Sequence, residues 1–552
     1  MGMVITMVLT NRPKIRYVLN QTALTVIAMA LLLLTGNSAR AQVKLEPKIS
    51  ANSYAYWYQD QQLSNDTDRG LALVLTPEIR LTRTGPNVKT SLFWQDEAIW
   101  YRDAQRSQQS AQTYKASNIV SFFNKRVSWG VNAAGGYQVR DTQQGVYADI
   151  VTSAENLAKT KNYGTNLNFT TLKGGQTEAN LALAYNVFKS DGSIIGQYDG
   201  YSNDSYRGKL NLGSSSRSGA FFWRLSGNYN LTERENYDNF ESGQANAIIG
   251  LPVLSYLSLL LRSSYERNEG STMYLNEFTS YGAGAELKLG RASWLNVTWN
   301  KSHLTNVAVD MLNLDAIDDE YIAGELFLAP SRRTSLSFSI DKRYFGRTRA
   351  LNANYNLRFI SIRLAANDTV RTQTQLGAAF EDLGIFVCPD GSTDLINCFR
   401  PPTNNYIPGA GESFQQAGQF IPELSERIVL SRNILLAIGY TKNKLSLNIS
   451  AGTGEDEYVE TQGLIKRHNL SMQGLWKLYS DFTVNAEANF YRLEYSVDDR
   501  TDENMSASLG LTYAISKKTD LKVTARHTRR DSSLDSLDIS ETRLGLGITY
   551  SF

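Results

Sequence analysis

The sequence holds three histidines, His303, His468 and His527, and histidine is the side chain best suited to general-base catalysis near neutral pH. Ser302 directly precedes His303, and a serine activated by a histidine is the core of many hydrolase sites. The surrounding residues have the pattern of a β-strand, in which neighbouring side chains point to opposite faces. A hydrolase at the end of such a strand is therefore the least favoured function, and we expect the chain not to be an enzyme.

Acidic side chains gather in three short stretches that precede or follow strand-like segments. Carboxylates in such groups could bind divalent cations that bridge lipopolysaccharide or an acidic polysaccharide, but none has the spacing of a calcium-binding loop. We therefore expect solvated loops, no metal site and no cofactor. The three stretches contain Asp310, Asp315, Asp318, Asp319 and Glu320; Glu455, Asp456 and Glu457; and Asp498, Asp499, Asp502 and Glu503.

The amino-terminal segment has the pattern of a secretory signal peptide. Arg12, Lys14 and Arg16 precede an uncharged apolar run, and Ala39 and Ala41 form a small-x-small cleavage site before Gln42. We therefore expect residues 1–41 to be removed and 42–552 to form the mature protein. The chain has 56 basic and 54 acidic side chains. Because the leader holds basic and no acidic residues, the mature chain is close to neutral, and nothing in its charge indicates nucleic-acid binding.

The two cysteines of the chain, Cys388 and Cys398, lie in the segment 373–424, which is rich in proline and glycine. In an exported chain, two cysteines this close most economically form a local disulfide. A metal site would need more ligands, and no histidine lies nearby. We expect 373–424 to be a long loop that is either extracellular or folded into the lumen of a barrel.

The elements that must position these residues are strands. From Lys44 onward, segments with period-two alternation are separated by turn residues, and almost no helical periodicity is found. The segments number about 24, with an uncertainty of two. Every second connection is short, such as Thr84 to Asn87 and Lys442 to Lys444, whereas the segments 140–159, 190–202, 305–317 and 373–424 belong to the opposite set. This segregation predicts a large antiparallel transmembrane β-barrel with periplasmic termini.

The last residues of the chain support the same fold. Leu544, Leu546, Ile548, Tyr550 and Phe552 alternate with small or polar residues up to the carboxyl terminus. This pattern resembles the assembly signal of bacterial outer-membrane proteins, whose last strand closes against the first. We therefore expect the outer membrane as the location, and lipid, lipopolysaccharide and the barrel-assembly machinery as partners. Aromatic residues near predicted strand ends are expected to form interfacial girdles: Trp57, Tyr58, Trp100, Tyr101, Tyr344, Phe345, Trp476 and Tyr479.

Alternation also predicts which charged residues face the lumen. These residues are of mixed sign, with a slight basic excess, and do not form the single-sign ring of an ion-selective pore. They are Glu286, Lys288, Glu325, Asp341, Arg358, Arg363, Lys477, Glu487, Lys522 and Arg526.

Two stretches resemble a known protein family. They are LAPSRRTSLSFSIDKRYFGRTRALNANYNLRFISIRLAANDTV from Leu328 and PELSERIVLSRNILLAIGYTKNKLSLNISAGTGED from Pro422. The Pro-Ser-x-Arg-Thr turn and the Arg-Tyr-Phe-Gly hairpin from Arg343 to Gly346 are similar to those of outer-membrane barrels associated with the PEP-CTERM/exosortase system in exopolysaccharide loci. The resemblance brings no catalytic residues, but implies a Gram-negative setting that produces extracellular polysaccharide and sorted surface proteins.

Two functions therefore stand ahead of a hydrolase. The first is a channel or secretion component for exopolysaccharide or surface proteins, with the polymer or its export apparatus as partner. The second is an outer-membrane anchor or receptor for surface polymer that conducts nothing.

Overall fold

The computed structural model describes most of the chain from Gln42 to Phe552 as β-structure. The described ranges are 42–61, 64–102, 108–139, 150–152, 154, 157–171, 176–191, 200–214, 221–235, 238–270, 274–290, 292–308, 315–331, 333–372, 380–389, 412–420, 428–458, 463–496, 499–534 and 537–552. Within these ranges, no helix is long and apolar enough to cross a membrane.

Twenty-four strands form one antiparallel sheet, and two more form a separate hairpin. The strands of the large sheet are β1 (Gln42–Asp60), β2 (Ser64–Thr84), β3 (Val88–Tyr101), β4 (Gln109–Phe122), β5 (Val127–Val139), β6 (Leu157–Thr170), β7 (Thr177–Ser190), β8 (Tyr201–Ser214), β9 (Phe222–Arg234), β10 (Phe240–Pro252), β11 (Leu257–Glu269), β12 (Tyr274–Lys288), β13 (Trp294–Ala308), β14 (Asp315–Ser331), β15 (Thr334–Arg343), β16 (Gly346–Asn356), β17 (Ile360–Thr372), β20 (Ile428–Lys442), β21 (Leu445–Tyr458), β22 (Gly463–Lys477), β23 (Phe482–Tyr495), β24 (Arg500–Ser516), β25 (Thr519–Ser532) and β26 (Ile539–Ser551). The hairpin consists of β18 (Phe380–Pro389) and β19 (Glu412–Phe420).

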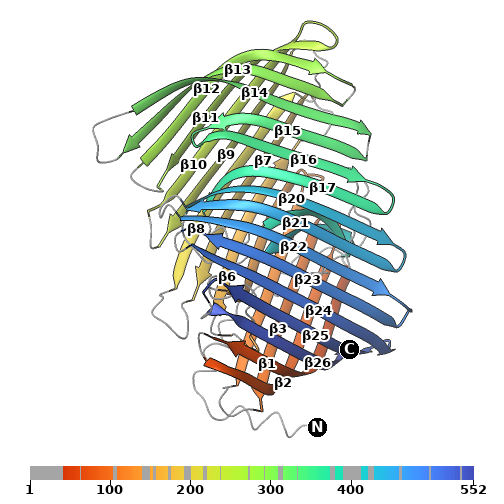
Figure 1. Cartoon of the computed structure of the whole chain (residues 1–552). Coiled ribbons are helices and arrows are strands. Elements are labelled where there is room, and N and C mark those ends of the chain that lie inside the picture. The colour runs from red at the N-terminus through yellow and green to blue at the C-terminus, as the bar shows by residue number, and fades with distance from the viewer. Residues whose placement is uncertain are drawn as a thin grey trace.

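The large sheet closes on itself through β1 and β26. These strands pair antiparallel from Lys48 opposite Ser551 to Asp60 opposite Ile539. At this seam the hydroxyls of Ser50 and Thr549 lie 2.9 Å apart. Figure 1 shows β26 beside β1, with the other strands forming the rest of the ring. The predicted large antiparallel barrel, with 24 strands in its ring, is thus confirmed.

The ring has one apolar and one polar face. The residues of the predicted carboxyl-terminal signal are all at least 40% exposed. Leu544, Leu546, Ile548 and Tyr550 lie on the outside of the ring, and Phe552 follows the end of β26. Residues paired with them across the seam, such as Ile49 opposite Tyr550, continue this face around the ring. The alternate residues line the lumen. An outward apolar face and a polar interior are what a membrane-spanning barrel requires.

The long connections lie on one rim and the other rim carries short turns, although the first rim also has short connections such as 344–345. Gln42 pairs with Thr84, beside the turn into β3, and Ser551 donates to the carbonyl of Lys518 in the turn before β25, so both ends of the described barrel lie at the short-turn rim. One expected loop differs from the prediction. The segment 305–317 is mostly strand, because β13 continues to Ala308 and β14 begins at Asp315. The segment 373–424 contains the hairpin β18–β19, which pairs with no barrel strand within the described ranges.

Candidate functional site: the barrel lumen

The lumen wall carries most of the predicted charged residues. Strand register places nine of the ten on the face opposite the exposed apolar side chains: Glu286, Lys288, Glu325, Asp341, Arg363, Lys477, Glu487, Lys522 and Arg526. Their surroundings differ. Glu286 is fully buried on β12, whereas Lys522 on β25 is exposed to the open lumen.

Arg358 does not lie on this wall, contrary to the prediction. It lies in the turn between β16 and β17, and its guanidinium is 5.0 Å from the ring centre of Phe359. Strand alternation does not apply inside a turn, so parity could not place this side chain.

One side of the lumen, between β9 and β15, is crossed by ion pairs. Arg262 of β11 binds Asp341 of β15, and Arg224 of β9 lies 3.8 Å from Glu325 of β14. Strands that are four or five positions apart can make such contacts only where the wall bends sharply. These side chains enclose a pocket of about 240 Å³.

Buried acids of the lumen farther along the ring are paired with arginines. Arg467 Nε lies 2.8 Å from Asp456 of β21, and Ser431 donates to the same carboxylate. Asp502 of β24 is fully buried and lies 2.9 Å from the guanidinium of Arg530. Arg500 lies 3.4 Å from the same carboxylate, so this cluster keeps one positive charge, whereas the charges of Asp456 and Arg467 balance.

This pairing corrects the expectation of solvated acidic loops. Asp456 and Asp502 are buried strand residues, and Asp318, Asp319, Glu320, Glu455, Glu457 and Glu503 also lie in strands. Asp310 and Asp498 lie outside the described residues. Among the residues that the structure describes, no group of histidine, cysteine or acidic side chains is placed to hold a metal ion.

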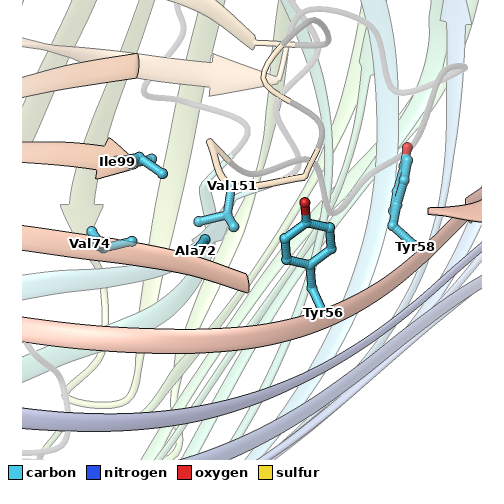
Figure 2. Close-up of a cluster of buried hydrophobic side chains, with 6 residues drawn as sticks. All are labelled: Tyr56, Tyr58, Ala72, Val74, Ile99 and Val151. Carbon is cyan, nitrogen blue, oxygen red and sulfur yellow. The ribbon is translucent and has the colours of Figure 1, made fainter. Parts of the chain in front are cut away.

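Residues 150–152 of the connection between β5 and β6 lie on the lumen side of the wall. Val151 packs against Tyr56 of β1 and the lumen-facing residues of β2 and β3, as Figure 2 shows. Thr152, which is 1% exposed, accepts a 3.1 Å hydrogen bond from Arg543 of β26. The described part of this connection therefore lies inside the ring, over the seam where the barrel closes.

Tyr58 and Tyr101 were predicted to belong to an interfacial girdle. The structure instead places them in this lumen cluster. Tyr58 is 6% exposed, and the Tyr101 hydroxyl donates to the carbonyl oxygens of Ile150 and Val151. Their sequence neighbours Trp57 and Trp100 are exposed on the outer face. An aromatic pair near a strand end therefore has one ring on each face, and alternation could have separated them.

Tyr344 is a third exception among the expected girdle residues. It lies between β15 and β16 and packs against a buried cluster that includes Phe278 and Tyr321. Burial and the nearby Glu266 carboxylate raise the pKa of Tyr344 above its ordinary value. By contrast, Trp476 and Tyr479 are exposed.

The histidines lie on the outer face and not in the lumen. His303 Nδ1 is 2.7 Å from Asp318 on the adjacent strand, and His468 and His527 contact threonine hydroxyls. Ser302 lies on the opposite face of β13 and is 5% exposed. The arrangement separates the serine from the histidine that would have to activate it.

Two predictions fall outside the described residues. Residues 1–41, with Ala39 and Ala41 of the cleavage site, are among them, and so are Cys398 and the side chain of Cys388. The signal peptide and the disulfide therefore stay predictions.

Comparison with known proteins supports the barrel. Residues 441–552, which include β21 to β26, match the model of a family described as Putative beta-barrel porin 2. No curated protein matches the sequence.

Similar solved structures include the siderophore receptor PirA from Acinetobacter baumannii, with 10% identity, a TM-score of 0.41, and coverage of 93% of this chain and 81% of that chain. The FrpB iron transporter from Neisseria meningitidis has 8% identity and a TM-score of 0.42, covering 95% and 83%. A loop-deletion mutant of OmpT, an outer membrane protein of Vibrio cholerae, has 8% identity and a TM-score of 0.27, covering 93% and 99%. The closed sheet and the family match together indicate a porin-like β-barrel of the outer membrane.

Proposed function

We propose that the chain is an outer-membrane channel through which a hydroxyl-rich polymer, an exopolysaccharide, leaves the cell. The observation that carries this proposal is the chemistry of the lumen wall, which presents side-chain amides on strands all around the ring. Examples on the lumen face are Asn132, Asn166, Asn186, Asn228, Asn246, Asn296, Asn352, Asn448, Asn469, Asn485 and Asn489.

An amide both donates and accepts hydrogen bonds, as sugar hydroxyls do. A wall of amides with paired charges offers many weak and exchangeable contacts and no strong field, which suits the passage of a neutral or weakly charged chain. The resemblance of residues around 320–460 to barrels of exopolysaccharide loci supports the same substrate class. Sorted surface proteins are the other cargo that this resemblance implies. We propose no enzymatic activity.

A non-conducting anchor for surface polymer is the second candidate. The observation that favours it is the described part of the connection between β5 and β6, which lies inside the ring with Val151 packed against β1, β2 and β3. An anchor would hold polymer at the outer rim and would not need an open passage.

Deletion of the gene separates the two functions. Loss of a channel should trap polymer in the periplasm, whereas loss of an anchor should shed polymer into the medium. A second test complements the deletion strain with variants of two neighbouring residues of β23, one facing the lumen and the other facing outward. Asn489→Trp narrows the lumen and should restore export poorly, whereas Ala488→Trp on the outer face should restore it fully. Equal export by both variants would argue against passage through the lumen.

A further inference from the structure

The wall of the barrel is interrupted between β14 and β15. β14 pairs with β13 from Asp315 to Phe327, but with β15 only from Gly324 to Ser331. Within the described residues, the part of β14 from Asp315 to Ala323 thus has no strand partner on the β15 side. Such an edge leaves backbone hydrogen-bonding groups unpaired by strand neighbours, which a closed barrel normally avoids.

The end of the β15–β16 hairpin lies on the lumen side of this edge. Lys342 shares the outward face of β15 with Ile340, by alternation, yet its ammonium is 2.5 Å from Asp319 on the lumen face of β14. An outward residue of β15 can meet an inward residue of β14 only if β15 passes inside β14 at this height. Arg343 then reaches the buried Glu266 of β11, with Nε 3.0 Å from Oε2. The Arg-Tyr-Phe-Gly motif therefore tucks the hairpin end into the lumen.

A groove of about 700 Å³ lies at the interruption. Trp299, Ile322 and Phe338 line it from the outer apolar face. Tyr321 and Asp341, which belong to the lumen face, line it as well. Residues of both faces of the sheet therefore line this groove, which lies at the interruption of the wall.

Charge at the outer end of the groove is unbalanced. Glu320 is paired with Lys301 at 3.3 Å, and Asp319 is paired with Lys342. Arg347 also lines the groove and interacts electrostatically with Asp319, which already has Lys342 as its partner. Two cations beside Asp319 leave an excess of positive charge next to the apolar side chains, which complements an acyl chain joined to an anionic head group.

We propose that this groove is a lateral binding site for a phosphorylated, acylated glycolipid of the outer leaflet. The acyl chain lies along Trp299, Ile322 and Phe338, the phosphate meets Arg347, and the sugar faces the slit toward the lumen. The inference rests on the proposed outer-membrane location. The position of Arg347 along the barrel axis indicates that the lipid comes from the outer leaflet. Arg347 lies beside the turn at 344–345, on the rim opposite the chain ends.

Gly324 offers a way to fill the groove. It lines the groove on the outer face, and a Cβ built there meets only the Asn296 carbonyl oxygen, at 3.7 Å. Gly208 of β8 is a matched control, because its Cβ would meet only Leu183 Cδ2, at 3.6 Å, on the outer face of a distant part of the wall. Gly324→Phe should therefore fill the groove without disturbing the backbone, and Gly208→Phe should add the same ring elsewhere.

The test measures binding of bisphosphorylated and phosphate-free lipid A to delipidated, full-length protein by native mass spectrometry. Wild type and Gly208→Phe should bind one bisphosphorylated lipid A, and Gly324→Phe should lose it. Arg347→Gln should weaken the preference for the phosphorylated form about fivefold, the size of one exposed ion pair. Equal binding by Gly324→Phe and Gly208→Phe would overturn the proposal, as would no preference for phosphate in the wild type. Failure of folded wild type to insert into bilayers would instead refute the membrane location itself.

Discussion

Tyr101 at the end of β3 donates a hydrogen bond of 2.8 Å to the carbonyl oxygen of Val151 in the connection between β5 and β6. The same hydroxyl lies 3.2 Å from the carbonyl oxygen of Ile150. Tyr101 thus helps to hold the described part of this connection against the lumen wall, together with Arg543, which donates to Thr152. If the lumen conducts, this contact sets the width of its passage near the seam.

Removing that hydroxyl should widen the passage. Tyr101→Phe keeps the ring and deletes the donor, which leaves two carbonyls of the connection without this partner at a cost of about 1–3 kcal/mol. We expect larger and noisier single-channel currents in planar bilayers. Tyr513→Phe, on the exposed outer face of β24, should leave the currents unchanged. Identical currents from wild type and Tyr101→Phe would show that this connection does not narrow the conducting path.

Two adjacent residues of β22 test which face meets lipid. Met472 is 44% exposed on the outer face, whereas Gln473 faces the lumen opposite Glu487. Met472→Arg should destabilise the barrel by about 2–4 kcal/mol, as a cation near the bilayer centre does. Gln473→Arg should have little effect, because the new cation can pair with Glu487. Urea unfolding in lipid vesicles, followed by tryptophan fluorescence, measures the free energy of unfolding of both variants. The opposite ranking would mean that the polar face is the one in lipid.

The ion pair of Arg343 and Glu266 should hold the β15–β16 hairpin in place. Glu266 is 2% exposed, so Arg343→Ala leaves a buried carboxylate without its cation, at a cost of about 3–5 kcal/mol. The double variant Arg343→Met with Glu266→Leu removes both charges and should recover most of that loss. Vesicle unfolding of wild type, Arg343→Met, Glu266→Leu and the double variant forms a double-mutant cycle. A double variant as unstable as Arg343→Ala would show that the hairpin is held by other contacts.

Lys522 and Arg526 should give the lumen its small anion preference. Both lie on the lumen face of β25, and Lys522 is exposed there. Replacing both by glutamine should move the reversal potential in a salt gradient toward cation selectivity. Lys44, which is paired with Glu46 at the end of β1, provides a control at the rim. Unchanged selectivity would place the controlling charges elsewhere.

The predicted disulfide between Cys388 and Cys398 has a direct test. Without reductant, neither cysteine of the unfolded protein should react with an alkylating reagent, and reduction should make both reactive. Alkylation of both cysteines before reduction would rule the disulfide out. The bond should stiffen the segment 373–424 with a gain of no more than a few kcal/mol.

Sequence predicts the ring well because each strand obeys one local rule. Alternation through Leu546 and Ile548 is visible without any partner strand, and it fixes the outer face that the structure shows. The same rule separates Trp57 on the outside from Tyr58 in the lumen, although the aromatic pair alone suggests a girdle.

Contacts across the lumen could not be predicted in this way. Arg262 and Asp341 are separated by three intervening strands, and their pairing depends on how sharply the wall bends. Alternation predicts on which face of the sheet a side chain lies, but it does not predict the cross-sectional shape of the ring. For the same reason, the interruption beside β14 is invisible in a sequence whose β15 pattern is regular.

The most direct test of the central claim is the current through purified, refolded protein in a planar bilayer, before and after a neutral polysaccharide is added on one side. A closed barrel with an amide-lined lumen should give discrete current steps that the polymer reduces reversibly. The absence of any current from inserted protein, in wild type and in Tyr101→Phe alike, would contradict the channel.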